Sequence, residues 1–161
     1  MTNEKAILLA CAALAIWTML VGVRMVYVRV REMKATHIHP QSVALSHQRL
    51  KAFEDSRASD NYNHLFELPV LFYALCALAV ASGHIPDGLP WAVWSFVGLR
   101  VIHSLIQCTY NRVVHRFLIF CVGLAVLALI WAAFTVSVLW GHVPFSSAVA
   151  CTVWATCLSI A

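Results

Sequence analysis

"FLIFCVGLAVLALIWAAFTVSVL" (residues 117–139) contains no charged residue, and this stretch decides the class of the fold. A helix crosses the hydrocarbon core of a bilayer in about 20 apolar residues, whereas an open sheet cannot cross it. The composition agrees: 61% of the residues are hydrophobic and 11% are charged, against roughly 25% charged residues in soluble domains. The sequence therefore indicates an integral membrane protein.

Three further apolar stretches cover residues 6–23, 68–83 and 89–107. The stretch at 68–83 is too short to cross a bilayer, so the second span must include the residues before it. We predict an all-α fold: a bundle of four transmembrane helices in one domain, residues 1–140. The apolar tail at 141–161 is predicted to form an interfacial or packed helix.

Basic residues gather in two of the connections between the spans. They are Arg24, Arg29, Arg31, Lys34, Arg49, Lys51, Arg57, Arg112 and Arg116. The connection at 82–90 and the tail after residue 139 have no Lys or Arg. The positive-inside rule predicts a multi-pass protein in which both basic connections are cytoplasmic and both termini are outside. The net charge of +4 then reflects topology and attraction to anionic membrane lipids, and no nucleic acid partner is expected.

Neither the cysteines nor the histidines form a metal-binding pattern. The six cysteines lie in apolar runs without a C-x-x-C pair, so we expect small buried side chains and no disulfide framework. His37, His39 and His47 lack a further ligand at the usual spacing, and no metal site is predicted.

A polar stripe precedes the second apolar stretch in "NYNHLFELPVLFY" (residues 61–73). At about 100° per residue, five polar residues at 57–67 fall within a helical sector of roughly 120°. They are Arg57, Asp60, Asn61, His64 and Glu67. Pro69 cannot donate to the carbonyl of Leu65, so a kink is expected beside this stripe.

The third span carries a second stripe, formed by Arg100, His103 and Gln107. A charge near the middle of the membrane costs roughly 2.5–3.5 kcal/mol, so Arg100 needs a partner or a watery cavity. Glu67 is the predicted partner. A purely structural ion pair is one interpretation, but it leaves the other polar residues of both stripes unexplained. The second interpretation is a cationic pocket that binds a small anion with several carboxylates, because the guanidinium group suits carboxylates.

Two stretches, "NYNHLFELPVLFY" (61–73) and "LRVIHSLIQCTYNRVVHRF" (99–117), resemble the MAPEG family, the membrane-associated proteins in eicosanoid and glutathione metabolism, most closely its small bacterial members. The resemblance covers roughly residues 6–140. It implies a four-helix bundle in a bacterial inner membrane that assembles as a homotrimer, with glutathione bound between subunits on the cytoplasmic side. Glu67 matches the glutamate of the family's Asn-x-x-Glu motif, whereas His64 stands at the asparagine position. Arg100 and His103 match Arg-x-x-His, whereas Gln107 stands where a tyrosine is expected.

The resemblance also implies roles for the polar residues. Arg116 and Arg112 would stabilise the thiolate of glutathione, which is the nucleophile, for attack on a lipophilic electrophile or hydroperoxide. The remaining candidates would bind the substrate: Arg57, Asn61, His64, Glu67, Arg100, His103, Gln107 and Tyr110. Tyr110 would replace the missing tyrosine. The expected activity is that of a glutathione transferase or peroxidase, with glutathione as co-substrate and no metal.

A different class of function is also open. The protein would then be a non-catalytic subunit with this fold, or a lipid-binding accessory protein, in a larger membrane complex. The small residues of the tail favour close helix packing, and the substitutions at His64 and Gln107 are consistent with lost catalysis. A channel or transporter is disfavoured because the sequence shows no internal repeat.

Overall fold

The computed structural model describes residues 2–43 and 57–141, and every regular element in them is helical. The elements are α1 (Asn3–Thr36), the short 3-10 helix η1 (Pro40–Val43), α3 (Arg57–His64), α4 (Leu68–Ser82), α5 (Leu89–Cys108) and α6 (Val113–Trp140). The predicted all-α class is confirmed. His47 and residues 142–161 of the predicted tail lie outside the described residues.

Four helical runs are long and apolar enough to cross a membrane: α1, α3 together with α4, α5, and α6. The helix α1 continues well beyond the apolar stretch at 6–23. Its 34 residues correspond to about 51 Å at 1.5 Å per residue, against a hydrocarbon core of about 30 Å. Arg29, Arg31 and Lys34 lie on this extension.

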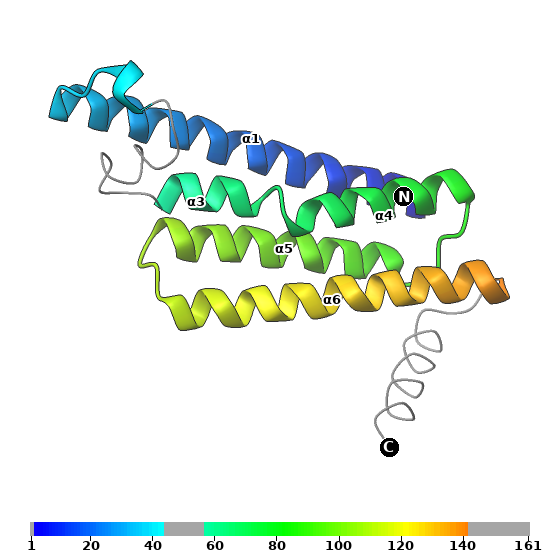
Figure 1. Ribbon diagram of the computed structural model, residues 1–161. Helices are drawn as coiled ribbons and strands as arrows, with labels where there is room; N and C mark the ends of the chain where they lie inside the picture. Colours follow the sequence, from blue (N-terminus) through cyan, green and yellow to red (C-terminus); the bar gives the residue numbers. More distant parts are fainter. Residues whose placement is uncertain (1, 44–56, 142–161) are drawn as a thin grey trace.

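The chain runs back and forth along the bundle (Figure 1). The N-terminus, the 82–89 turn and the end of α6 lie at one end. The end of α1, the start of α3 and the 109–112 turn lie at the other, which we call the basic end. The helix α5 contacts α1, α3 and α6, so side chains on α5 can meet all three.

The second span breaks at residues 65–67, between α3 and α4. Leu68 and Pro69 open α4, and Pro69 has no N–H for the carbonyl of Leu65. The N–H of Phe66 donates to the carbonyl of Asn63 at 2.9 Å, a tighter turn than an α-helix makes. The predicted kink is confirmed. However, treating 57–67 as one continuous helix was wrong, because α3 ends at His64 and Glu67 lies within the break.

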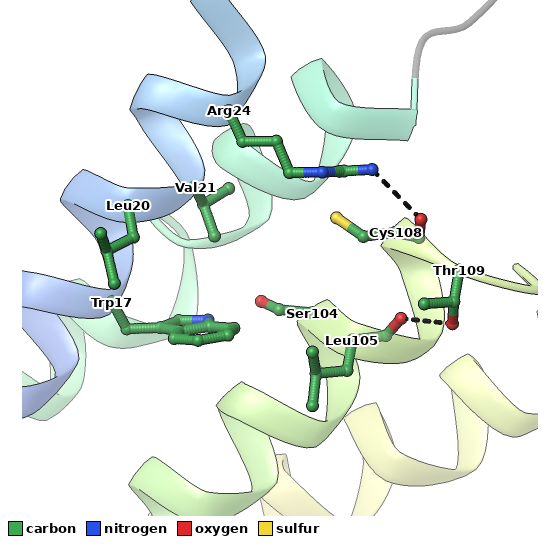
Figure 2. Close-up of a pocket in the computed structure, with 8 residues that line it drawn as sticks. All are labelled: Trp17, Leu20, Val21, Arg24, Ser104, Leu105, Cys108 and Thr109. Carbon is green, nitrogen blue, oxygen red and sulfur yellow. Dashed lines mark hydrogen bonds between the residues drawn. The ribbon is translucent and has the colours of Figure 1, made fainter. Parts of the chain in front are cut away.

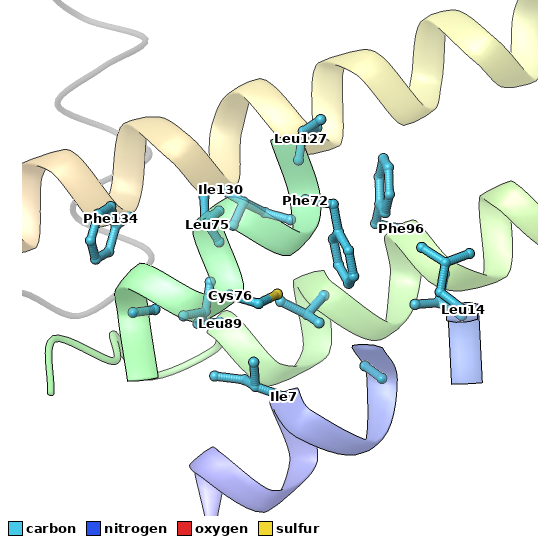
Figure 3. Close-up of a cluster of buried hydrophobic side chains, with 14 residues drawn as sticks. Ile7, Leu14, Phe72, Leu75, Cys76, Leu89, Phe96, Leu127, Ile130 and Phe134 are labelled. Carbon is cyan, nitrogen blue, oxygen red and sulfur yellow. The ribbon is translucent and has the colours of Figure 1, made fainter. Parts of the chain in front are cut away.

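The half of the bundle opposite the basic end is a packed apolar core (Figure 3). Phe72 of α4 stacks on Phe96 of α5, with ring centroids 4.9 Å apart and planes 16° from parallel. Ile7 and Leu14 of α1 and Ile130 of α6 are fully buried in the same cluster. This core fixes the positions of α5 and α6 and therefore the geometry of the polar residues beyond it.

Candidate functional site

The polar stripe of α5 (Arg100, His103 and Gln107) is buried in the bundle. The three residues are 2%, 5% and 0% exposed, which confirms that the stripe faces inward. Six of their buried polar atoms have no hydrogen-bond partner: Nε and Nη2 of Arg100, both ring nitrogens of His103, and Nε2 and Oε1 of Gln107. A buried polar group without a partner costs about 1–3 kcal/mol. Among the described residues, this stripe therefore holds six of the seven buried side-chain polar atoms that lack a hydrogen bond.

The guanidinium group of Arg100 packs against two aromatic rings and lies beside a glycine. Its guanidinium carbon lies 5.1 Å from the ring centroid of Phe96 and 5.5 Å from that of Phe120, within the range of cation–π attraction. A Cβ added at Gly123 of α6 would lie 2.5 Å from Nη2 of Arg100. Gly123 therefore provides the space for the guanidinium. The sequence did not predict this role, because nothing in an apolar run indicates which side chain of another helix will pack against its glycine.

The predicted ion pair between Glu67 and Arg100 is not formed, and this expectation was wrong. Oε2 of Glu67 instead lies 2.9 Å from Nδ1 of His64, and the Glu67 side chain is 54% exposed. The break at 65–67 changes the direction of the chain, so Glu67 no longer follows the helical face of α3. Its carboxylate remains within electrostatic range of Arg100.

The two predicted stripes meet at His64 and His103. Their ring centroids are 6.0 Å apart and the rings are nearly perpendicular. The His103 ring also lies 6.4 Å from that of Phe120 on α6. The contact joins the two stripes at one point, and α6 adds Phe120 beside it. The stripe at 57–67 was expected to face inward, but only Asn61 of it is buried, and Arg57, Asp60 and Glu67 are exposed.

Asn61, by contrast, is satisfied within the protein. It is fully buried, and its Oδ1 accepts a hydrogen bond from Oγ of Ser104 at 3.0 Å. Its Nδ2 donates to Sγ of Cys108 at 3.3 Å. Asn61 therefore joins α3 to α5, and this arrangement leaves its amide little capacity for a ligand. Ser104 and Cys108 lie one turn apart on α5, but their residue types alone gave no indication of this role.

The predicted arginines lie at the basic end. Arg57 Nη1 donates to the carbonyl of Thr109 at 3.1 Å, at the end of α5. Arg116 Nη1 donates to Oδ1 of Asn111 at 3.0 Å. Arg112 is the exposed N-cap residue of α6. All three guanidinium groups lie near the point where α5 ends and α6 begins, so positive charge is concentrated there.

Tyr110 does not take the place of the missing tyrosine on α5. Its side chain is 56% exposed, and its hydroxyl lies 3.2 Å from Nδ1 of His115. The hydroxyl therefore has a partner in the turn, away from the buried stripe. Gln107 occupies the tyrosine position itself, fully buried and without hydrogen bonds.

The polar side chains around the α5 stripe are groups that can pair with an organic anion. The described residues contain no group of three or more His, Cys, Asp or Glu side chains positioned to hold a metal. Arginine donors, imidazole nitrogens and an amide can instead pair with carboxylates and peptide groups. The half-exposed Glu67 adds an acceptor for a cationic group.

One comparison with known proteins gives a match. No curated protein and no solved structure gives a significant match. The sequence profile of the MAPEG family matches residues 7–136, which include most of α1 and α6, all of α3, α4 and α5, and the polar residues of the two stripes. Four membrane-length helices, the buried stripe of α5 and this match over most of the chain together show that the protein belongs to the MAPEG family.

Proposed function

We propose that the protein binds glutathione at the basic end of the bundle and that its thiolate attacks a lipophilic electrophile or hydroperoxide. Family membership supports a function of the glutathione-transferase or eicosanoid-metabolism kind. The observation that carries the finer proposal is the set of six buried, unpartnered polar atoms on Arg100, His103 and Gln107. A tripeptide with two carboxylates, two amides and an ammonium group offers partners for such atoms.

The charges at the basic end match the charges of glutathione. Arg57 and Arg100 suit its carboxylates, because a guanidinium group forms charge-assisted and often bidentate bonds to a carboxylate. Glu67 suits its ammonium group, since much of the carboxylate is exposed. His64 holds Glu67 in place through the 2.9 Å contact and lies beside His103. His103 and Gln107 supply hydrogen bonds to the peptide groups.

The chemistry requires a thiolate. A thiol with an ordinary pKa is mostly protonated at neutral pH, and positive charge nearby favours the anion. Arg116 uses one of its five donors on Asn111 and, with the exposed Arg112, supplies that charge. The thiol proton passes to water. The sulfur then bonds to an electrophilic carbon, and the leaving group departs with the bonding electrons.

The second substrate reaches this position from the bilayer, and the assembly is a homotrimer in which neighbouring chains complete each site. The basic end faces the cytoplasm. These statements follow from the family resemblance and the distribution of basic residues.

The test is glutathione binding and thiolate formation in detergent-purified protein. We expect calorimetric binding and the ultraviolet absorbance of the thiolate on adding glutathione. Conjugation of a chloro-dinitroaryl electrophile is also expected. In Arg116→Ala, binding should persist while the thiolate absorbance falls at least tenfold. Arg31→Ala, which removes an exposed arginine from the extension of α1, is the matched control and should behave as the wild type.

Absence of binding and thiolate in wild-type protein at millimolar glutathione contradicts the proposal, because a ligand well above its dissociation constant must also raise thermal stability. Binding without thiolate or conjugation contradicts the catalytic part alone.

One observation favours a second candidate, a non-catalytic subunit of a larger membrane complex. The Tyr110 hydroxyl is engaged by His115, so no tyrosine among the described residues supplies the hydrogen bond that the family resemblance assigns to this position. Purification in mild detergent separates the candidates. Recovery of an unrelated membrane complex in fixed stoichiometry, together with absent glutathione binding, favours the subunit.

A further inference from the structure

A cavity of about 250 Å³ lies between α1 and α5, away from the polar stripe (Figure 2). Its lining includes Trp17, Leu20, Val21 and Arg24 of α1 and Ser104 and Leu105 of α5. Leu20 and Leu105 are 57% and 48% exposed, so the rims of this cleft face the surroundings of the bundle. None of these residues belongs to the proposed glutathione site.

The floor of the cleft, formed by Val21 and Ser104, offers an occupant no free hydrogen-bonding group. Ser104 is 1% exposed, and its hydroxyl donates to Asn61 at 3.0 Å. Val21, also on the floor, is 5% exposed. Such a lining accepts a hydrocarbon chain and offers a polar molecule few hydrogen bonds.

Two hydrogen-bond donors, on Trp17 and Arg24, indicate where a molecule in the cleft should carry acceptor groups. Nε1 of Trp17 is buried and has no hydrogen-bond partner. At the other end of the cleft, Arg24 is exposed, and its Nη2 donates to the carbonyl of Cys108 at 3.2 Å. Figure 2 shows the Trp17 ring lying across one end of the cleft and the Arg24 side chain reaching over the other.

The spacing of these donors matches a membrane lipid. Trp17 and Arg24 are seven positions apart on α1, which is about 10 Å along a helix. Arg24 lies level with the last turn of α5, where this span leaves the apolar region, and Trp17 lies deeper. A phosphate at Arg24 would place the ester groups of the same lipid toward Trp17 and an acyl chain along Leu20 and Leu105.

We infer that the cleft between α1 and α5 binds one anionic phospholipid, with its phosphate at Arg24 and an acyl chain against Trp17, Leu20 and Leu105. Basic pockets between transmembrane helices are sites of this kind. Charge complementarity favours a lipid over a second copy of the chain, because an apolar helix over Arg24 would bury its charge with only the Cys108 carbonyl and no anionic partner. This inference does not depend on the proposed function.

The test is native mass spectrometry of the full chain in detergent, titrated with phosphatidylglycerol and, separately, with phosphatidylcholine. Wild-type protein should retain one phosphatidylglycerol per chain and bind phosphatidylcholine more weakly. Arg24→Gln should weaken the phosphatidylglycerol site about fivefold, the effect of one basic residue at a membrane surface. Leu20→Trp, which fills the cleft, should remove the site.

Two matched controls keep the result interpretable. Arg31→Gln removes an exposed arginine from the extension of α1, and Met19→Trp adds the same ring at a position that is 69% exposed and outside the lining. Both should bind phosphatidylglycerol as the wild type does. Glutathione calorimetry on all variants should be unchanged, which separates this inference from the proposed function.

Three outcomes overturn the inference. The first is equal phosphatidylglycerol binding by wild type, Arg24→Gln and Leu20→Trp. The second is competition by soluble glycerol phosphate at equal concentration, because the site would then hold an anion without a chain. The third is a change of oligomeric state in Leu20→Trp with lipid binding intact, because a second copy would then cover the cleft.

Discussion

The two halves of the bundle are built from the same helices but satisfy their buried groups differently. In the half opposite the basic end, Phe72 and Phe96 stack at 4.9 Å and the neighbouring side chains are apolar. Toward the basic end, α5 buries Arg100, His103 and Gln107 with six polar atoms unpartnered. The first half is complete in one chain. The second half leaves these buried polar groups without hydrogen bonds among the described residues, at a cost of about 1–3 kcal/mol for each group.

Phe72→Ala tests the apolar half and should have the largest effect. Loss of the buried ring should lower the free energy of unfolding by about 3–5 kcal/mol, because a cavity replaces the stack on Phe96. Thermal unfolding in detergent measures it. The neighbouring Leu71→Ala is the control, since Leu71 is 50% exposed and should change stability by less than about 1 kcal/mol. Equal effects of the two variants would mean that the stack is not part of a packed core.

Gly123→Ala tests the space around Arg100. The added Cβ would lie 2.5 Å from Nη2, so the guanidinium or α6 must shift, at a cost of about 1–3 kcal/mol. Glutathione affinity should fall with it. Gly98→Ala on α5 is the matched control, because nothing lies within 4 Å of its added Cβ. If Gly98→Ala loses as much stability and glutathione affinity as Gly123→Ala, the space that Gly123 leaves for Arg100 has no special role.

Arg100→Met tests whether Arg100, in the half of the bundle toward the basic end, contributes to protein stability or to glutathione binding. Arg100 makes no ion pair among the described residues, and replacing such a buried charge by an apolar side chain of similar size is often neutral or stabilising. The free energy of unfolding should therefore change by less than about 1 kcal/mol or increase. Calorimetry should show at least a tenfold loss of glutathione affinity. Strong destabilisation with intact binding would assign Arg100 a purely structural role.

His64→Asn should have the smallest effect. The substitution introduces the amide of the family's Asn-x-x-Glu motif, which can still hydrogen-bond to Glu67. Because His64 is partly exposed, stability should change by less than about 0.5 kcal/mol, and the dissociation constant for glutathione by less than threefold. The exposed His37→Asn serves as control. A complete loss of binding in His64→Asn alone would give the imidazole itself a specific role.

The spans could be predicted from the length of the apolar stretches, and the inward direction of the α5 stripe could be predicted from the helical period. Residues 100, 103 and 107 share a helical face whatever surrounds them, and burying that face avoids exposing a charge to lipid. The residues that surround the Arg100 guanidinium could not be predicted from the helical period. They depend on the break at 65–67, which moves Glu67 toward His64, and on Gly123 and Phe120, which belong to an otherwise apolar helix.

The sequence by itself determined the class, the four spans and the kink at Pro69, because apolar length, helical period and the missing proline N–H act within one segment. Only the tertiary structure decided which groups are paired. Asn61 is satisfied by Ser104 and Cys108, whereas Arg100, His103 and Gln107 keep unpartnered atoms. Pairing depends on distances between helices, and those distances are set by how the apolar half packs.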